Sequence, residues 1–593
     1  MLLENPGKDA ATAGGRSGSI DDEDLLLFLV SLLTLTVFAG LFVLRFLDDN
    51  RLTSWQWVFD GTDLRLVFLS LVVGVFFAQA FSRATLRWSN PAIWLFVSSF
   101  AVAGFFWRLP EVNIDASRYF IQAKSLEQFG VGYFLEEWGG DIGAWTDLPL
   151  VPFLYGLVLS LFGEVRTAIQ AFTTLLFSGT VVLTYLIGRT LWNETVGCCA
   201  AVLLLGMPYL LTQVPLMLSD VPAMFFLTLA VYATIGTVRH GGARFLVLAP
   251  VAITLAMLSK YSNWILLSIV PVIFLTHLDL GLKVLVRRAA VVSLGAALLA
   301  GGLILGMHDV VEEQLTLLRS YQLPALSRWG ESHISTFFFQ LHPFIAVAAA
   351  VSMLVAAKKR DYRYAIVCWM LLLLLALGAE RIRYLLVAFP MLALMAGYAV
   401  AEIGNARVRR HVVACTLAAM LVTAVFAYLP FLQGTSAVNL QQAGEHLDTL
   451  ASEHVEVFAL PQTRTAVNPA IAVPILDIYT DKTIALHPDA EMTARPESVE
   501  TSPVRFTWDY DSARYYAARD GESGDEATVV VVSANSDQAL PERLKRRIAG
   551  HRLSGEFAAT DRVFRYKTIV KVYQPLQRRP EMARVVNGGE AMR

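Results

Sequence analysis

Long apolar runs separated by short polar segments fill most of the chain up to position 430. A membrane-spanning helix needs about 20 mainly apolar residues, and about 17 is the usual minimum. Runs of this kind predict about 13 transmembrane helices, at 25–47, 64–82, 92–108, 167–189, 196–213, 220–238, 245–259, 262–277, 289–306, 340–357, 364–379, 384–401 and 411–430. A further apolar run, 149–162, is short and ends at a Gly-Glu pair, so we interpret it as an interfacial or re-entrant helix.

Basic residues orient these helices. Clusters follow the even-numbered runs only, and they contain Arg83 and Arg87, Arg189, Arg239 to Arg244, Lys283 to Arg288, Lys358 to Arg360, and Arg407 to Arg410. Cytosolic loops are enriched in Lys and Arg, so one orientation fits every cluster: a cytosolic N-terminus with the odd-to-even loops outside. Counting 149–162 as a full span would invert all later clusters. Compact loops without a retention signal favour the plasma (inner) membrane of a prokaryote.

The pattern changes after position 430. A polar helical stretch (441–453), strand-like runs (454–460, 528–534 and 568–574) and a basic helix (542–550) predict an extracytosolic α/β domain over 431–575. This domain has no glycine-rich phosphate loop and no metal signature, so we assign it no chemistry. The composition of 1–24 predicts a disordered cytosolic N-terminus, and 576–593 is expected to be a flexible tail.

Composition supports a membrane protein. The 593 residues are 55% hydrophobic and 17% charged, with a mean hydropathy of +0.52, whereas a soluble chain is about a quarter charged. The net charge of −2 leaves no basic surplus for phosphates, which argues against nucleic acid as a partner. All four cysteines lie inside apolar runs and are expected to be packing residues.

The candidate chemistry lies in the segment 108–148, the longest polar run between apolar segments in the first half. It holds seven acidic and three basic residues, and a short amphipathic helix is expected after Asp115. Functional residues concentrate in loops of this size. We therefore expect the active site here, with a second extracytosolic loop at 307–339.

Several ionisable residues fall on the expected outer face, and such groups at membrane depth are functional candidates. They are Asp115, Asp147, Asp220, Lys260, His342, Arg381, Arg383 and Tyr384. Structural roles compete for some of them. Asp220, two residues before a proline, could cap a helix, the two arginines could anchor a helix at headgroup level, and His342 could be a turn residue. Lys260 breaks the pattern of basic residues on the inside, which favours a functional role.

This set suits transfer from a lipid-linked phosphate. Arg or Lys neutralises a phosphate leaving group, and a carboxylate can accept the proton of an acceptor hydroxyl. No cofactor is required. Asp115 and Asp220 could share a divalent cation, but such sites usually have more oxygen ligands, so no metal is expected.

The ordered stretches IDASRYFIQAKSLEQFG, DLPLVPFLYGLVLSLFGEVR, QVPLMLSDVPAMFF, LSKYSNWILLSIVPVI and RIRYLLVAFPMLAL resemble GT-C glycosyltransferases. The resemblance is to the family 39 protein mannosyltransferases and the lipid A aminoarabinose transferases, over about 109–428. It implies an inverting transfer of sugar from a polyprenyl phosphate, with Asp115 as the general base. Ala116 replaces the second acid of the family's Asp-Glu pair, three spans rather than one precede this loop, and the α/β tail is not general to the family.

The resemblance implies that Lys260, Arg383 and Tyr384 hold the donor phosphate. Asp147 and Asp220 are expected to shape the sugar pocket, while Arg319 and Tyr321 cover the lipid headgroup. The acceptor is a protein, lipid or polysaccharide. Three alternatives stay open: an oligosaccharyltransferase or ligase that uses a lipid diphosphate, a transporter of lipid-linked sugar, and a non-catalytic scaffold.

Overall fold

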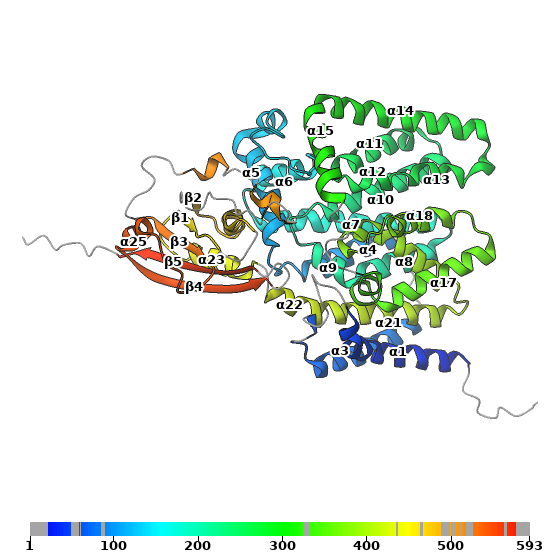
Figure 1. The fold of residues 1–593 in the computed structure, drawn as a ribbon. Coiled ribbons are helices and arrows are strands. Elements are labelled where there is room, and N and C mark those ends of the chain that lie inside the picture. Colours follow the sequence, from blue (N-terminus) through cyan, green and yellow to red (C-terminus); the bar gives the residue numbers. More distant parts are fainter. Residues whose placement is uncertain are drawn as a thin grey trace, which may run out of the picture.

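A computed structural model describes residues 22–48, 58–59, 61–84, 89–323, 332–434, 437–462, 467–487, 499, 502, 504–508, 513–517, 526–561 and 566–576. A helical part and a smaller part built on one sheet lie end to end (Figure 1). Of the expected disordered N-terminus, 22–24 belong to the first helix and 1–21 lie outside the described residues. The expected tail, apart from position 576, also lies outside them.

Each of the 13 predicted apolar runs is largely helical. Seven described helices are long and apolar enough to cross a membrane. They are α1 (Asp22–Leu44, extended by η1, Arg45–Leu47), α3 (Leu64–Arg83), α7 (Arg166–Leu191), α10 (Asp220–Arg239), α14 (Leu282–Gly306), the run of α19 (Ile382–Leu385), η5 (Leu386–Ala388) and α20 (Phe389–Ala401), and the run of α21 (Ala406–Thr423), η6 (Ala424–Tyr428) and α22 (Leu429–Gln433).

The remaining predicted runs form shorter helices. These are α4 (Pro91–Gly104), α8 (Glu194–Gly206) with α9 (Pro208–Gln213), α11 (Ala243–Ser259), α12 (Ser262–Leu266) with α13 (Ile269–Leu275), α17 (Pro343–Lys359) and α18 (Tyr364–Ala376). The run 196–213 is broken because Met207 precedes a proline and adopts an extended conformation.

Helices α7, α8, α10 and α20 form the centre of the helical part. A Cβ on Gly188 of α7 would lie 2.7 Å from the Cα atom of Gly197 in α8, and one on Gly397 of α20 would lie 2.7 Å from the backbone nitrogen of Ala200. Such close backbone packing needs glycine. In contrast, α1, α3 and α14 expose most of their apolar side chains, as helices that face lipid do.

Basic residues gather at the end of the helical part that lies away from the sheet. There they bond the ends of other helices: Arg239 donates to the carbonyl of Thr190, Arg363 to that of Leu191, and Lys359 pairs with Glu402. Arg407 pairs with Glu23 at the start of α1. The clusters that sequence assigns to one side of the membrane therefore lie together.

The expected loop 108–148 is mostly helix. Helix α5 (Asn113–Glu136) is longer than the short helix expected, and Gly130, with φ of 86°, breaks it near its end. Helix α6 (Leu150–Phe162) lies against α5 at Gly156, where a Cβ would be 2.7 Å from the Cβ atom of Leu126. The second expected loop, 307–339, contains α15 (His308–Leu317) and the π-helical turns η3 (Leu318–Gln322) and η4 (Ser335–Leu341), and 324–331 lie outside the described residues.

The C-terminal part is an α/β domain, as predicted. Its sheet has the order β2-β1-β3-β5-β4, with β1 (His454–Ala459) parallel to β2 (Thr483–Leu486) and β3 (Thr528–Ser533), and β5 (Tyr566–Pro575) antiparallel to β3 and to β4 (His551–Asp561). Helix α25 (Glu542–Ile548) packs on one face through Leu544. Helices α23 (Val438–Asp448) and α24 (Ala472–Asp477) lie on the other face, in one apolar cluster with α5 and α6. The core of this domain therefore continues into the helical part.

Candidate active site

The candidate site lies where α5 meets the ends of α10, α11 and the α19 segment. Asp115 is in the first turn of α5, and its carboxylate forms an ion pair with the Arg383 guanidinium, which also contacts Asp220 at 2.9 Å from Nε. Lys260, at the C-terminal end of α11, pairs with the other Asp220 oxygen at 2.5 Å. The structure thus brings together four of the predicted residues, from four separate segments.

Asp147 joins this site through α5. Arg118, one helical turn after Asp115, contacts Asp115 at 3.7 Å and Asp147 at 2.5 Å. The Tyr119 hydroxyl is 3.1 Å from Asp147 and 2.8 Å from the Ser219 hydroxyl, next to Asp220. A continuous chain of charged and hydroxyl groups therefore runs from Lys260 to Asp147.

The three carboxylates differ in accessibility. The side chain of Asp115 is 21% exposed, whereas those of Asp220 and Asp147 are 1% and 7% exposed. Lys260 is also partly exposed, at 22%. Asp115 is therefore the most accessible of these three carboxylates, and Asp220 pairs with both Arg383 and Lys260.

Burial and neighbouring charge move the acids in opposite directions. Burial alone would raise the pKa of Asp115, but Arg383 and Arg118 outweigh it and hold that pKa well below its ordinary value. Burial raises the pKa of Asp147 because Arg118 offsets the loss of water only in part and Asp115 adds repulsion. Asp115 is therefore ionised in the resting site.

Aromatic rings line one side of the site. Trp145 has a φ of 47°, a strained conformation for a bulky residue. Its ring lies 5.5 Å from that of Tyr321 and 5.8 Å from that of Phe506, and the Arg118 guanidinium is 5.0 Å from the Phe506 ring. The Tyr321 hydroxyl donates to the carbonyl of Ser502 at 2.6 Å. Both loops and the α/β domain thus meet here.

Of the other predicted residues, Arg381 lies near enough to Asp115 for its charge to help lower the pKa of that carboxyl. The Arg381 guanidinium lies 5.8 Å from the centre of the Tyr384 ring, and that half-buried ring packs against the helical core. His342 is buried at the start of α17, where its Nδ1 accepts from the backbone of Phe344 at 3.3 Å, as a helix cap does. Arg319 is exposed on η3. Their substrate-binding roles stay predictions.

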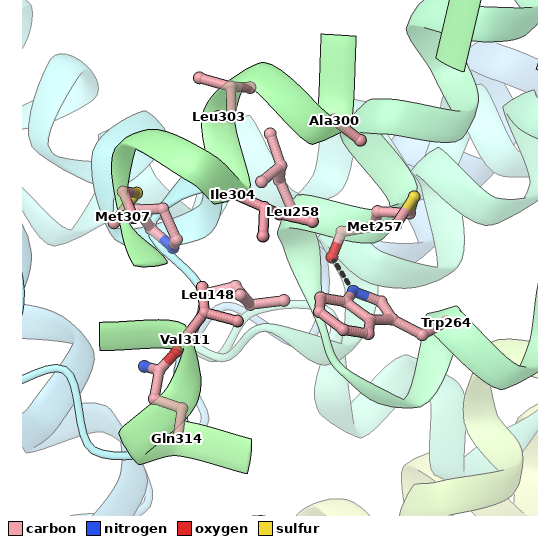
Figure 2. A pocket seen from close by; sticks show the side chains of 11 residues that line it. Leu148, Met257, Leu258, Trp264, Ala300, Leu303, Ile304, Met307, Val311 and Gln314 are labelled. Carbon is pink, nitrogen blue, oxygen red and sulfur yellow. Dashed lines mark hydrogen bonds between the residues drawn. The ribbon is translucent and has the colours of Figure 1, made fainter. Parts of the chain in front are cut away.

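An apolar pocket lies beside the site (Figure 2). Its walls come from α11, α12, α14, α15 and the segment before α6, and include Leu148, Leu258, Trp264, Ile304 and Val311. The Trp264 indole donates to the carbonyl of Met257 at 2.8 Å and is fixed by that bond.

The pocket is joined to the ionic site by one polar side chain. Gln314, in the pocket wall, donates to the backbone carbonyl of Asp147 at 2.7 Å and accepts from the Tyr261 hydroxyl, next to Lys260. The apolar space and the charged chain therefore adjoin.

Sequence reasoning missed Arg118 and Tyr119. A helix starting at Asn113 places residues three and four positions after Asp115 on its face of the helix, so an earlier helix start would have identified both. Nothing in the sequence indicated Ser219 or Gln314, because each acts through a contact between distant segments. Within the described residues no group of three or more His, Cys, Asp or Glu side chains is placed to hold a metal ion, and Arg383 lies between Asp115 and Asp220.

Comparisons with known proteins identify similar sequences and folds. The family model for dolichyl-phosphate-mannose-protein mannosyltransferase matches residues 147–303. ArnT from Cupriavidus metallidurans, in a crystal structure with bound undecaprenyl phosphate, has 11% identity and a TM-score of 0.52, covering 80% of this chain and 97% of ArnT. These matches confirm the predicted GT-C fold and the resemblance to mannosyltransferases and ArnT.

Two further solved structures are similar at a lower level. The apo oligosaccharyltransferase of Archaeoglobus fulgidus has 12% identity and a TM-score of 0.45, covering 75% of this chain and 69% of its own. The arabinofuranosyltransferase AftD from Mycobacteria has 14% identity and a TM-score of 0.45, covering 83% of this chain and 40% of its own. A comparison with curated proteins finds no match.

Proposed function

We propose that this chain, a membrane glycosyltransferase with the GT-C fold, transfers a sugar with inversion from a polyprenyl-phosphate carrier to an extracytosolic acceptor. One observation carries the proposal: Asp115, the most accessible of the three site carboxylates, pairs with Arg383, and Asp220 pairs with both Arg383 and Lys260. Base and phosphate-binding cations are thereby adjacent, as the reaction needs.

The phosphate and the polyprenyl chain of the donor bind to different parts of the site. Its phosphate binds Arg383 and Lys260, which can each donate charge-assisted hydrogen bonds to phosphate oxygens. Its polyprenyl chain occupies the apolar pocket between α11 and α14 (Figure 2), whose wall residue Gln314 contacts Tyr261, the neighbour of Lys260. ArnT, which shares the fold, has undecaprenyl phosphate bound in its solved structure, and this supports a donor of the same kind here.

The transfer step exchanges one bond for another. An acceptor hydroxyl oxygen attacks the anomeric carbon while the bond from that carbon to the phosphate oxygen breaks. Asp115 takes the hydroxyl proton, and the bonding electrons leave with the polyprenyl phosphate, whose new negative charge Arg383 and Lys260 neutralise. Attack from the face opposite the leaving group inverts the anomeric centre.

The resting ion pair prepares Asp115 for this role. While Arg383 contacts Asp115, the carboxylate is ionised but its pKa is too low for it to be a strong base. A donor phosphate competes for the same guanidinium. Its binding therefore weakens the hold of Arg383 on Asp115 and raises the pKa of the base when a substrate is present.

The remaining predicted residues complete the pocket. Asp147, which Arg118 and Tyr119 hold in place, is proposed to contact the sugar, and Trp145 offers an aromatic face beside it. Arg319 and Tyr321 cover the lipid headgroup, Tyr384 helps to hold the donor phosphate, and Arg381 and His342 contribute to substrate binding. The acceptor is a protein, lipid or glycan at the outer face of a prokaryotic inner membrane. The common side of the basic clusters supports a cytosolic N-terminus and an extracytosolic α/β domain.

Transfer of radiolabelled sugar in proteoliposomes tests the proposal. Polyprenyl-monophosphate sugars are offered against nucleotide-sugar and lipid-diphosphate donors, with a membrane extract supplying acceptor. We expect label to move from the monophosphate donor only, and Asp115→Asn to lower kcat by about 10²- to 10⁴-fold at temperatures where the variant is still folded.

Asp141→Asn is the matched control, because Asp141 lies in the same segment but pairs with Arg514 at the surface. It should keep full activity. Activity of Asp115→Asn equal to wild type would refute the base assignment. Use of the lipid-diphosphate donor alone would indicate an oligosaccharyltransferase-like enzyme, and movement of labelled lipid without transfer would indicate a transporter.

A further inference from the structure

The α/β domain contacts α5 through two charged groups buried between them. The Lys124 ammonium lies 2.7 Å from the carboxylate of Asp477, the last residue of α24, and 2.6 Å from that of Glu164, between α6 and α7. The Tyr516 hydroxyl donates to Asp477 at 2.6 Å. The Asp477 side chain is 2% exposed. Burial raises the pKa of Asp477 to about 6, and Lys124 keeps it from rising further.

This contact is on the side of α5 opposite the reacting carboxylate. Lys124 follows Asp115 by nine residues, about two and a half helical turns, so the two side chains point in opposite directions. The Tyr515 hydroxyl adds a bond to the carbonyl of Ile121 at 3.0 Å. The α/β domain thus supports α5 from behind, while Arg383 contacts its front.

A second contact holds the residues just before α5. The Tyr479 hydroxyl accepts a hydrogen bond from the backbone nitrogen of Glu111 at 2.6 Å. The Glu111 carboxylate is 3.0 Å from Arg166 at the start of α7 and accepts from the backbone of Met217 at 3.0 Å. The start of α5, where Asp115 lies, is therefore fixed to the α/β domain and to the helical core.

The backbone behind these contacts is closely packed. A Cβ on Gly444 of α23 would lie 2.5 Å from the carbonyl oxygen of Tyr479. Asp477 and Tyr479 are separated by one residue, so one short segment at the end of α24 makes both contacts. The side chains that hold α5 are thus attached to a rigid part of the domain.

We propose that the segment 477–479 positions the catalytic helix, with Lys124 and Tyr479 as positioning residues that act through Asp115. The proposal rests on the proposed transferase function and assigns the α/β domain a role in it. Loss of either contact lets the first turns of α5 move, so Asp115 leaves its position relative to Arg383 and the acceptor. Small displacements of a reacting group lower the rate of the chemical step strongly.

Hydrogen exchange and kinetics of the full-length protein in lipid nanodiscs test this inference together. Lys124→Met and Tyr479→Phe are expected to raise amide exchange of peptides covering 113–124 about tenfold. In the transfer assay, kcat should fall about 10- to 100-fold while KM for the lipid donor stays unchanged, because the pocket between α11 and α14 is intact. Lys124→Arg, which keeps the charge, should recover most of the lost kcat.

The matched control is Arg514→Ala. Arg514 also joins the α/β domain to the first loop, through Asp141 at 2.5 Å, but its side chain is 70% exposed, and exposed ion pairs contribute little. The amide exchange of 113–124 and the kcat of Arg514→Ala should equal those of wild type. If amide exchange of 113–124 is unchanged in Lys124→Met and Tyr479→Phe, the inference is overturned, whether or not any donor is turned over. If exchange rises but the wild-type protein transfers no sugar, only the proposed function is refuted.

Discussion

Asp115 combines an accessible carboxylate with an arginine that neutralises it at rest. An unpaired carboxylate beside an acceptor site would attract cations and water, whereas this one is held by Arg383 and Arg118. Its partner Arg383 also contacts the buried Asp220. In the proposed reaction, Asp220 would retain Arg383 at the site when the donor phosphate draws it away from Asp115.

This pairing predicts how stability depends on pH. Because the pKa of Asp115 is lowered in the folded protein, its ion pair stabilises the fold above the ordinary carboxyl pKa of 3.8 and is lost as the pH falls below it. The gap in melting temperature between wild type and Asp115→Asn should be constant from about pH 8 to 5 and shrink below about pH 4. A gap that closes between about pH 7 and 5 would show that Asp115 lacks its arginine partner.

The residues of the charged chain differ in how far sequence could predict them. Four of its charges lie at the ends of apolar runs: Asp115, Asp220, Lys260 and Arg383. Burying a charge there is costly, so the sequence marks these residues as functional candidates. The aromatic Tyr384 lies next to Arg383 in sequence, yet its ring faces the core, because side chains of adjacent helical residues point about 100° apart. The sequence does not show that the Tyr384 ring packs on the core, and its contact with the donor phosphate stays a prediction.

Among the elements, α5 and α6 act as one unit. Their contact at Gly156 is too close for any side chain, since a Cβ would also lie 2.9 Å from the carbonyl oxygen of Ala123. Helix α6 in turn is held to the segment before α10, where the Tyr155 hydroxyl donates to the carbonyl of Leu218 at 2.7 Å. The spacing between α5 and the Asp220 segment is therefore set by small residues and one buried hydroxyl.

Gly156→Ala is expected to push α5 away and to lower both activity and stability. Overpacking of this kind costs about 1–3 kcal/mol, which a thermal shift assay detects, and kcat should fall more than KM for the donor changes. Gly132→Ala is the control, because Gly132 lies on α5 with no atom within 4 Å of an added Cβ. An active and stable Gly156→Ala variant would mean that α6 does not constrain α5.

At this scale the periodicity of apolar residues predicted helices well and strands less well. Buried β1 and β3 are runs of apolar residues and were predicted. The four-residue β2 and the edge strand β4 were missed, because β2 is too short for a pattern and half of the β4 residues are polar. The predicted loop at 108–148 is mostly helical. Its apolar side chains are buried against α6 and the α/β domain, and a short stretch of sequence around the loop does not contain these partners.

For the whole molecule, the prediction concerns orientation. The α/β domain lies at one end of the molecule (Figure 1), and basic residues lie together where several helices end. With the proposed topology, a cysteine at Lys545, which is 54% exposed on α25, should react with an impermeant maleimide in intact cells. A cysteine at Tyr362, 76% exposed between α17 and α18, should react only after permeabilisation. Equal labelling of both in intact cells would contradict this topology.

The buried contact between Lys124 and Asp477 also has a consequence in time. The two residues are 353 positions apart, and α5 emerges from the ribosome long before Asp477 is made. At typical synthesis rates the interval is about 20 to 70 s. During it the membrane helices can insert, but α5 lacks its contacts with the α/β domain. With the support that we propose for α5, the protein reaches its full activity only near the end of its own translation, once the α/β domain has folded.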